Sequence, residues 1–320
     1  MSTSLNQLYR AIGISKQAVH KMLNINQKRK DESEQLNRFI EEIRKDHPTM
    51  GMRDLYFKIN PEFMGRDQFE AYCKKSGFMI EKKKRHCVTT DSSGVIRFPD
   101  LIKELNIVRV NQVWQSDITY YEVNGKFYYI TFIIDSYSRR ILGYSVSCRL
   151  LTSQTTLPAL SMAIKSRFNS DLQGLIFHSD GGGQYYAREF LKMTKDFGII
   201  NSMCKNAYEN GKAERVNGVI KNNYLIHKKI NNFEKLIKEV DHAVSMYNYE
   251  KPHIKLKRKS PIQFENNLLS LKRENTVKMT KLSDAKINKT LFSAGIKPSE
   301  KQKKKTARNR NVFFANLIES

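Results

Sequence analysis

The chain has 320 residues, of which 40% are hydrophobic and 10% aromatic, and these proportions exclude a wholly disordered protein. It carries 56 Lys and Arg against 32 Asp and Glu, a net charge of +24 that far exceeds what solubility requires. Such an excess indicates a polyanionic partner, with nucleic acid ahead of an anionic membrane surface.

Membrane, secretion and disulfide signals are missing from the sequence. No run approaches the roughly 18 apolar residues of a membrane-spanning helix, and the N-terminus lacks a signal-peptide pattern. We therefore expect a cytoplasmic protein without membrane contact. The four cysteines lie far apart and form no C-x-x-C pair, which argues against a zinc site or a disulfide framework.

The first predicted domain, residues 1–28, has the pattern of a short helix-turn-helix. Apolar residues at helical spacing precede a break at Gly13, and Ser15 is placed to cap a second helix. A generic helical hairpin explains this segment equally well. If it is a recognition helix, three side chains face DNA base edges: Lys16, Gln17 and His20.

Residues 29–88 form a second predicted domain, also helical and helix-turn-helix-like. Apolar residues recur at helical spacing over residues 36–43, and a later helix ends at Gly77. Arg53 and Arg66 are further candidates for DNA contact in this domain. Two such blocks in one strongly basic chain favour DNA binding more than either block alone.

A linker at residues 89–104, with Ser, Gly and Pro, precedes a change to strand-like patterns in residues 105–267. Two β-branched and aromatic runs meet at Asn124-Gly125, a strong hairpin signal. A third strand follows, then helix, strand, helix, strand and two long helices, at about residues 210–229 and 233–249. This order predicts an α/β, ribonuclease-H-like domain with a mixed five-stranded sheet and flanking helices. Residues 268–320 are basic and weakly periodic, and we expect a flexible tail.

Three carboxylates in this predicted domain lie at positions that suggest a functional site. Asp117 lies inside the apolar run VWQSDITYY, where a charge is costly unless it is paired or bound to metal. Asp180 ends the fourth predicted strand, where ligands gather in α/β sheets, and Glu214 begins a long helix. Each alone has an ordinary structural explanation. Together they predict a site that holds two Mg²⁺ ions, with Mn²⁺ able to substitute, and acts on a phosphodiester.

Residues next to these carboxylates have structural as well as functional interpretations. Asp135, in DSYSRR, is typical of a tight turn, and Trp114 is most simply a core residue. His178 fits a packed strand histidine as well as one near the metals. The residues around Glu214 fit either a solvated basic face or phosphate contacts by Lys212, Arg215, Asn217 and Lys221.

Three glycines, residues 181–183, directly follow Asp180. Bulky side chains there would crowd a phosphodiester that approaches the carboxylates. Glycine also allows a sharp turn from the end of a strand into a helix. We therefore interpret this bare loop as the floor of a DNA-cutting site.

The chain resembles the insertion-sequence-three family of bacterial transposases, which are relatives of the retroviral integrases. VWQSDITYY resembles the family's W-x-x-D-I-T-Y, and FHSDGGGQYYAREF resembles its H-S-D-x-G-x-Q-Y. The segments FIIDSYSRRILGYSVS, NAYENGKAERVNGVIKNNYL and YNYEKPHIKLKRKSPIQF match further family patterns, and HPTMGMRDLYFKI resembles the helix-turn-helix before the core. The resemblance covers about residues 31–264.

The resemblance implies that the family's catalytic, metal-binding D-D-E triad is Asp117, Asp180 and Glu214. Asp180 and Glu214 are separated by 33 residues, two fewer than in the family pattern, and the missing pair lies in the loop before NAYEN. Glu209 takes the place of the Asp in the family's Asp-Asn-Ala and is an alternative to Glu214 as the third catalytic acid. The two glutamates differ by more than one helical turn, so they cannot both face the metals, and we favour Glu214.

The resemblance also implies an activity. The helical domains would recognise terminal inverted repeats, and the core would cut one strand and join its 3′-hydroxyl to another phosphodiester, by copy-out/paste-in transposition at the bacterial nucleoid. Holding both ends of double-stranded DNA together requires a homo-oligomer, at least a dimer. The alternatives are a DNA-binding regulator on an inactive core and a nuclease that only hydrolyses. Whether the chain acts alone or as part of a frameshift fusion stays open.

Overall fold

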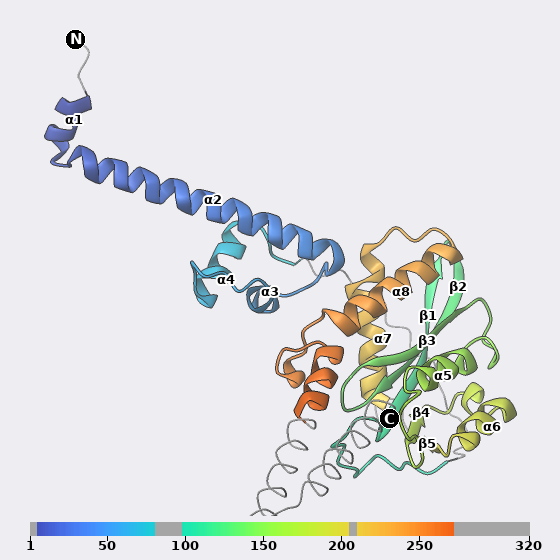
Figure 1. Ribbon diagram of the computed structural model, residues 1–320. Helices are drawn as coiled ribbons and strands as arrows, with labels where there is room; N and C mark the ends of the chain where they lie inside the picture. The colour runs from blue at the N-terminus through green and yellow to red at the C-terminus, as the bar shows by residue number, and fades with distance from the viewer. Residues whose placement is uncertain (1–4, 81–97, 205–209, 272–320) are drawn as a thin grey trace, which may run out of the picture. The chain divides into compact units, whose positions relative to one another are not determined.

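The computed structural model describes residues 5–80, 98–204 and 210–271 and divides the chain into two compact units (Figure 1). The first unit comprises residues 1–88 with 219–229, and the second comprises residues 89–218 with 230–320. The expected basic tail lies outside the described residues from residue 272 onward. Within the described ranges, no helix is long and apolar enough to cross a bilayer.

The first unit contains four helices within residues 5–80: α1 (Leu5–Ile12), α2 (Lys16–Asp46), α3 (Met52–Ile59) and α4 (Arg66–Lys75). Ser15 caps α2 as expected, because its side chain accepts a hydrogen bond from the Ala18 N–H at 3.1 Å. α2 is one continuous helix of 31 residues, so the proposed domain boundary at residue 28 falls inside a helix. That division and the helix-turn-helix assignments stay predictions.

The core of the first unit lies where the C-terminal half of α2 packs against α3 and α4. Apolar residues at helical spacing bury one face of α2 against the shorter helices. The buried side chains are Leu36, Ile40, Met50, Leu55, Phe69 and Cys73.

The second unit is built on a five-stranded sheet in the order β3-β2-β1-β4-β5 (Figure 1). The strands are β1 (Val113–Val123), β2 (Lys126–Asp135), β3 (Ile141–Ser147), β4 (Ile176–Ser179) and β5 (Ile200–Met203). β1, β2 and β3 are antiparallel neighbours, while β4 runs parallel to β1 and to β5. The predicted hairpin is present, and Asn124 and Gly125 both adopt the positive φ that its tight turn requires (53° and 77°). The predicted mixed sheet, with β1 at its centre, is confirmed.

The second unit also contains the helices α5 (Thr156–Lys165), α6 (Arg188–Asp196) and α8 (Phe233–Tyr249), a helix at residues 261–271 and the 3₁₀ turns Gly183–Tyr185 and Ile254–Leu256. α7 (Gly211–Asn223) begins in the second unit, and its last residues and the 3₁₀ turn Leu225–His227 belong to the first. α8 has the predicted bounds. α7 was expected to reach residue 229 but ends at Asn223, because Tyr224 leaves the helical region at φ −121°.

The main core lies between the sheet and the helices α5 and α6. Trp114, Leu160, Phe177 and Phe190 are fully buried there. α5 lies directly on β3 because Gly143 has no side chain, and a Cβ there would be 2.0 Å from the Ala159 carbonyl oxygen. Side chains alternate along β1, so Trp114 and Ser116 face this core while Gln115 and Asp117 face α7 on the opposite side.

Candidate active site

Asp117 and Asp180 are placed side by side by the two central parallel strands. β1 and β4 pair with Val113 opposite Ile176, Trp114 opposite Phe177 and Gln115 opposite His178. The partners in each pair differ by 63 in residue number, and Asp117 and Asp180 differ by the same amount. Neighbouring strands lie about 4.8 Å apart, so continuing this register by two residues brings the two carboxylates close together.

The electrostatics of Asp117 bring Glu214 into the same site. Burial, followed by the negative charges of Asp180 and of Glu214, raises the pKa of Asp117 to about 7, although hydrogen bonds to the carboxylate act in the opposite direction. One of these bonds comes from Asn217 in α7, whose amide nitrogen donates to Asp117 Oδ2 at 2.7 Å. Asp180 and Glu214 therefore both lie within electrostatic reach of Asp117.

Asp180 lies at the start of the glycine loop. The Gly182 N–H donates to Asp180 Oδ1 at 3.2 Å, and burial raises the pKa of the Asp180 carboxyl above its usual range. None of the three glycines adopts a positive φ, so the expected need for glycine to make the turn was wrong. Space is limited at two of them: a Cβ on Gly182 would lie 3.1 Å from Asp180 Oδ1, and one on Gly181 would lie 2.8 Å from Cε, the flexible end of Met203, whereas a Cβ on Gly183 would have no neighbour closer than 4.0 Å.

Glu214 lies in the first turn of α7 and is exposed. Its exposure contrasts with the burial of Asn217, one helical turn later, which is 5% exposed. The rival acid Glu209 lies outside the described residues.

Asp135, His178 and Trp114, which had both structural and functional interpretations from the sequence, are all buried in the structure. Asp135 is buried and accepts hydrogen bonds from the backbone N–H groups of Asn111, Tyr137 and Ser138, as a turn residue does. The His178 ring is buried, with Nδ1 2.9 Å from Ser202 Oγ on β5. Trp114 is a core residue.

The candidate DNA contacts around Glu214 differ in their surroundings. Arg215 is exposed and Lys221 is half-buried. Lys212 is half-buried and donates to the Ser136 carbonyl at 3.1 Å, and burial lowers the pKa of its ammonium group. Asn217 is buried and its amide nitrogen binds Asp117, so its position is not that of a surface contact to DNA.

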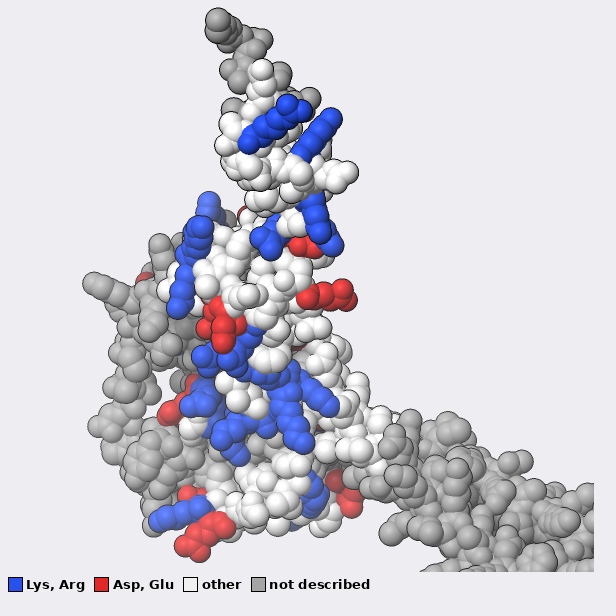
Figure 2. Space-filling model, turned by 90° about the vertical axis from the view of Figure 1, so that its left-hand side faces the viewer, with Lys and Arg blue, Asp and Glu red and all other residues white. Residues whose placement is uncertain are grey.

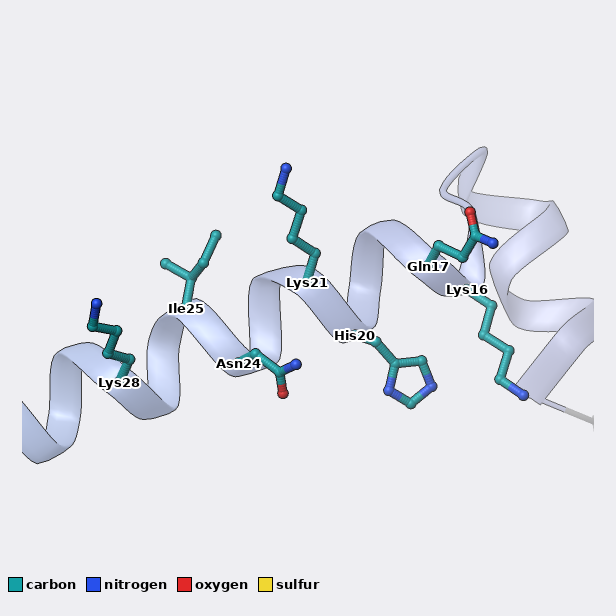
Figure 3. A pocket seen from close by; sticks show the side chains of 7 residues that line it. All are labelled: Lys16, Gln17, His20, Lys21, Asn24, Ile25 and Lys28. Carbon is teal, nitrogen blue, oxygen red and sulfur yellow. The ribbon is translucent and has the colours of Figure 1, made fainter.

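The candidate DNA contacts of the first unit lie on the N-terminal half of α2 and on α3 and α4. The predicted contacts on α2 (Lys16, Gln17 and His20) are exposed and lie along a shallow hollow on the helix. The hollow is lined by Lys16, Gln17, His20, Lys21, Asn24, Ile25 and Lys28 (Figure 3). Residues 16–30 contain five Lys and Arg and no Asp or Glu. The face of the molecule in Figure 2 likewise displays more Lys and Arg than Asp and Glu. Arg53 and Arg66, in contrast, form exposed ion pairs with Glu70 and Asp67.

One residue at the site was not singled out from the sequence, although the family pattern matched by NAYENGKAERVNGVIKNNYL also has asparagine at its position. Asn210 is buried directly before α7, where its amide nitrogen donates to the Ser116 carbonyl at 2.8 Å. Asparagine is common in loops, and its contact to a strand 94 residues earlier exists only in the folded chain.

Comparison with known proteins identifies the class of this domain. Residues 108–208 match one Integrase core domain family, and residues 197–261 match a second family of the same description. A 31 kDa protein of insertion element IS600 from Shigella sonnei is 30% identical over 244 residues, covering 74% of this chain and 88% of that protein.

Two further proteins are similar over shorter parts. A putative transposase for insertion sequence element IS986/IS6110 from Mycobacterium tuberculosis is 35% identical over 185 residues, covering 55% of this chain and 66% of that protein. The solved HTLV-2 integrase catalytic core domain in complex with magnesium is 22% identical, with a TM-score of 0.40, and covers 48% of this chain and 95% of that one.

The integrase core places the chain among the polynucleotidyl transferases with a ribonuclease-H-like sheet. More narrowly, it belongs to the insertion-sequence-three (IS3) family of bacterial transposases, as its similarity to the insertion-element proteins shows.

Proposed function

We propose that this transposase binds the terminal inverted repeats of an insertion sequence and catalyses Mg²⁺-dependent DNA strand cleavage and strand transfer. The proposal is supported mainly by the position of Asp117 on β1 beside Asp180, which directly follows the adjacent parallel strand β4, with the charge of Glu214 acting on Asp117. Residues 105–267 form the catalytic domain in this proposal, and residues 1–28 and 29–88 recognise DNA.

We assign Asp117, Asp180 and Glu214 as the catalytic ligands of two Mg²⁺ ions. Carboxylate oxygens are the hard donors that Mg²⁺ prefers, and Mn²⁺ can take the same sites. Burial and the negative charges of Asp180 and Glu214 together raise the pKa of Asp117 to about 7, and bound cations would offset both. Asn217 Oδ1 supports the fit, because it is buried beside Asp117 without a hydrogen-bond partner among the described residues and can accept from hydrated ions.

The protein supplies an incomplete ligand set, as Mg²⁺ sites that act on phosphates do. In the described parts of the chain, no three His, Cys, Asp or Glu side chains form a metal-binding group by themselves. Mg²⁺ is commonly held through one or two carboxylates, with substrate phosphate oxygens and water as the other ligands. DNA is therefore expected to complete the site.

The residues of the site have separable tasks. Bound ions would activate the attacking hydroxyl and stabilise the leaving oxygen. Asn217 orients Asp117, and the Gly182 N–H orients Asp180. Glu214 lies on an exposed turn and can approach the ions from solvent, while the glycine loop leaves space for the phosphodiester.

The partners in this proposal are the element's terminal repeats and a target duplex. Lysines on the N-terminal half of α2 can neutralise phosphates, which makes binding sensitive to salt. In this proposal Lys212 and Arg215, which lie on either side of Glu214 in the sequence, contact DNA near the reacting phosphodiester. Joining two ends requires that both be held at once, so the active species is at least a homodimer on DNA.

A strand-transfer assay tests the proposal. Purified protein is incubated with Mg²⁺, labelled element ends and a supercoiled target, and joined products are resolved on a gel. Asp117→Asn and Glu214→Gln should abolish joining. Glu234→Gln is the matched control, because Glu234 is an exposed acid in the first turn of α8, as Glu214 is in α7, and it should leave joining unchanged.

Each other outcome selects an alternative. Undiminished joining by Asp117→Asn would refute the assigned site. Cleaved but never joined ends would favour a nuclease, and end binding without any cleavage would favour a regulator on an inactive core.

A further inference from the structure

Two buried asparagines connect the start of α7 to β1, on either side of Glu214. Asn210 precedes Glu214 by four residues and Asn217 follows it by three. Residues at these spacings share one face of a helix. The face of α7 that carries Glu214 is therefore also the face that contacts β1.

Asn210 forms the first connection, to the strand residue next to Asp117. It is 1% exposed, its amide nitrogen donates to the Ser116 carbonyl at 2.8 Å, and its Oδ1 accepts from Gln115 Nε2 at 3.3 Å. Gln115 in turn accepts from Ser136 Oγ at 2.9 Å, at the end of β2. Both ends of the Asn210 amide are thus used, and its position relative to β1 is determined.

Asn217 forms the second connection, to Asp117 itself. It is 5% exposed, and its amide nitrogen lies 2.7 Å from Asp117 Oδ2. A carboxylate bonded to a fixed donor loses rotational freedom. This bond therefore orients the Asp117 carboxylate as well as attaching α7.

We propose that Asn210 and Asn217 are positioning residues that hold α7 against β1 and thereby set the geometry between Glu214 and Asp117. The proposal rests on the proposed function, because it concerns the metal site of the same three carboxylates. Hydrogen-bond partners of metal ligands typically contribute 10- to 100-fold in metal affinity or activity. Neither asparagine needs to touch DNA or the reacting atoms for this role.

The chain contains a matched control for a buried asparagine of this kind. Asn248 in α8 is 7% exposed, donates to the Ile141 carbonyl at 2.8 Å and accepts from the Ile141 N–H at 2.9 Å. It attaches α8 to β3 in the way that Asn210 attaches α7 to β1. Asn248→Ala should therefore lower stability by a similar amount without touching the metal site.

Binding of Mn²⁺ to the full-length chain, followed by electron paramagnetic resonance of free Mn²⁺, tests the proposal. Asn210→Ala should weaken Mn²⁺ binding by about 10- to 100-fold, with a parallel loss of strand transfer. Asn248→Ala should bind Mn²⁺ like the wild type despite a comparable fall in unfolding midpoint. Wild-type affinity in Asn210→Ala, or equal weakening in Asn248→Ala, overturns the proposal.

Two further variants keep the test decisive. If Asn210→Ala does not fold, Asn217→Ala removes the second connection, and the same weakening is expected; unchanged Mn²⁺ affinity there refutes the proposal. Asp117→Asn separates this inference from the proposed function. If Asp117→Asn keeps wild-type Mn²⁺ binding, the metal site itself is misassigned. If it loses binding while both asparagine variants keep it, only the positioning role fails.

Discussion

Replacing Asp117 by Asn should abolish strand transfer and, at high pH and without metal, make the protein more stable. Asparagine has the same shape and can still accept the hydrogen bond from Asn217, but it carries no charge. The substitution therefore removes the buried negative charge that Asp180 and Glu214 oppose, while it keeps the packing around it.

The size and sign of this effect follow from the pKa of Asp117. Its pKa rises from 3.8 in an ordinary aspartate to about 7 in the folded protein. Each pKa unit corresponds to about 1.4 kcal/mol, which gives an upper value of about 4 kcal/mol. Because Asp117 is partly exposed, solvent screens part of this, and we expect roughly 1–4 kcal/mol.

The raised pKa determines the pH window. The folded state prefers the protonated carboxyl, so its contribution to stability is complete below about pH 4 and is lost as the pH rises through about 7. Wild type and Asp117→Asn should be equally stable near pH 4. The variant should be the more stable protein at pH 8.

Urea unfolding in the presence of EDTA at the two pH values measures this difference directly. Adding Mg²⁺ at pH 8 should then stabilise the wild type and not the variant, because bound cations take over the role of the proton. Glu234→Gln removes an exposed acid and should show neither effect. A variant no more stable than the wild type at pH 8 would refute the buried-charge reasoning.

Three further predictions concern the loop, a structural ion pair and DNA binding. Gly182→Ala should reduce strand transfer in the gel assay by about 10- to 100-fold, because its Cβ would lie 3.1 Å from Asp180 Oδ1. Gly183→Ala is the control: its Cβ has no neighbour closer than 4.0 Å, so strand transfer should change little. Glu265→Gln should destabilise the protein by about 3 kcal/mol in urea unfolding at pH 7, because two arginines lose their buried partner. Although burial acts in the opposite direction, hydrogen bonds and charge from Arg167 lower the pKa of Glu265 below its usual 4.5, so the difference from the wild type should begin to shrink only below that pH and vanish once the pH is below the lowered pKa. Lys21→Ala should reduce the slope of log affinity against log salt by about 1 in filter binding, and an unchanged slope would place this lysine away from phosphate.

Local signals in the sequence predicted much of this fold. The Asn-Gly turn, the β-branched runs and the apolar spacing of α8 depend on neighbouring residues, so they were readable without the structure. Asp117 and Asp180 were identifiable because an acid in an apolar strand and an acid at a strand end both need an explanation.

Other features were not predictable from the sequence, because they depend on contacts between distant residues or on segments without apolar periodicity. The length of α2 was missed because its middle is polar, and polar helical residues lack the apolar periodicity that reveals a helix. The glycine loop was predicted to leave room for a phosphodiester and to allow a sharp turn, but the nearest neighbours of an added Cβ, Asp180 Oδ1 at Gly182 and Met203 Cε on β5 at Gly181, depend on the tertiary fold. Asn217 was predicted to contact DNA because its helix is basic, yet tertiary packing directs it to Asp117.

The positioning role proposed for Asn210 also explains how the site tolerates a departure from the family pattern. Two residues are missing between Asp180 and Glu214, in the loop before NAYEN, and a shorter loop could shift the register of everything after it. β5 ends at Met203, and Cys204 still donates to the Ser179 carbonyl at 3.0 Å, so the sheet side of the loop is fixed. Asn210 fixes the helix side by its bond to Ser116. With both sides held, Glu214 keeps its position as the fourth residue after Asn210, whatever the number of residues before Asn210.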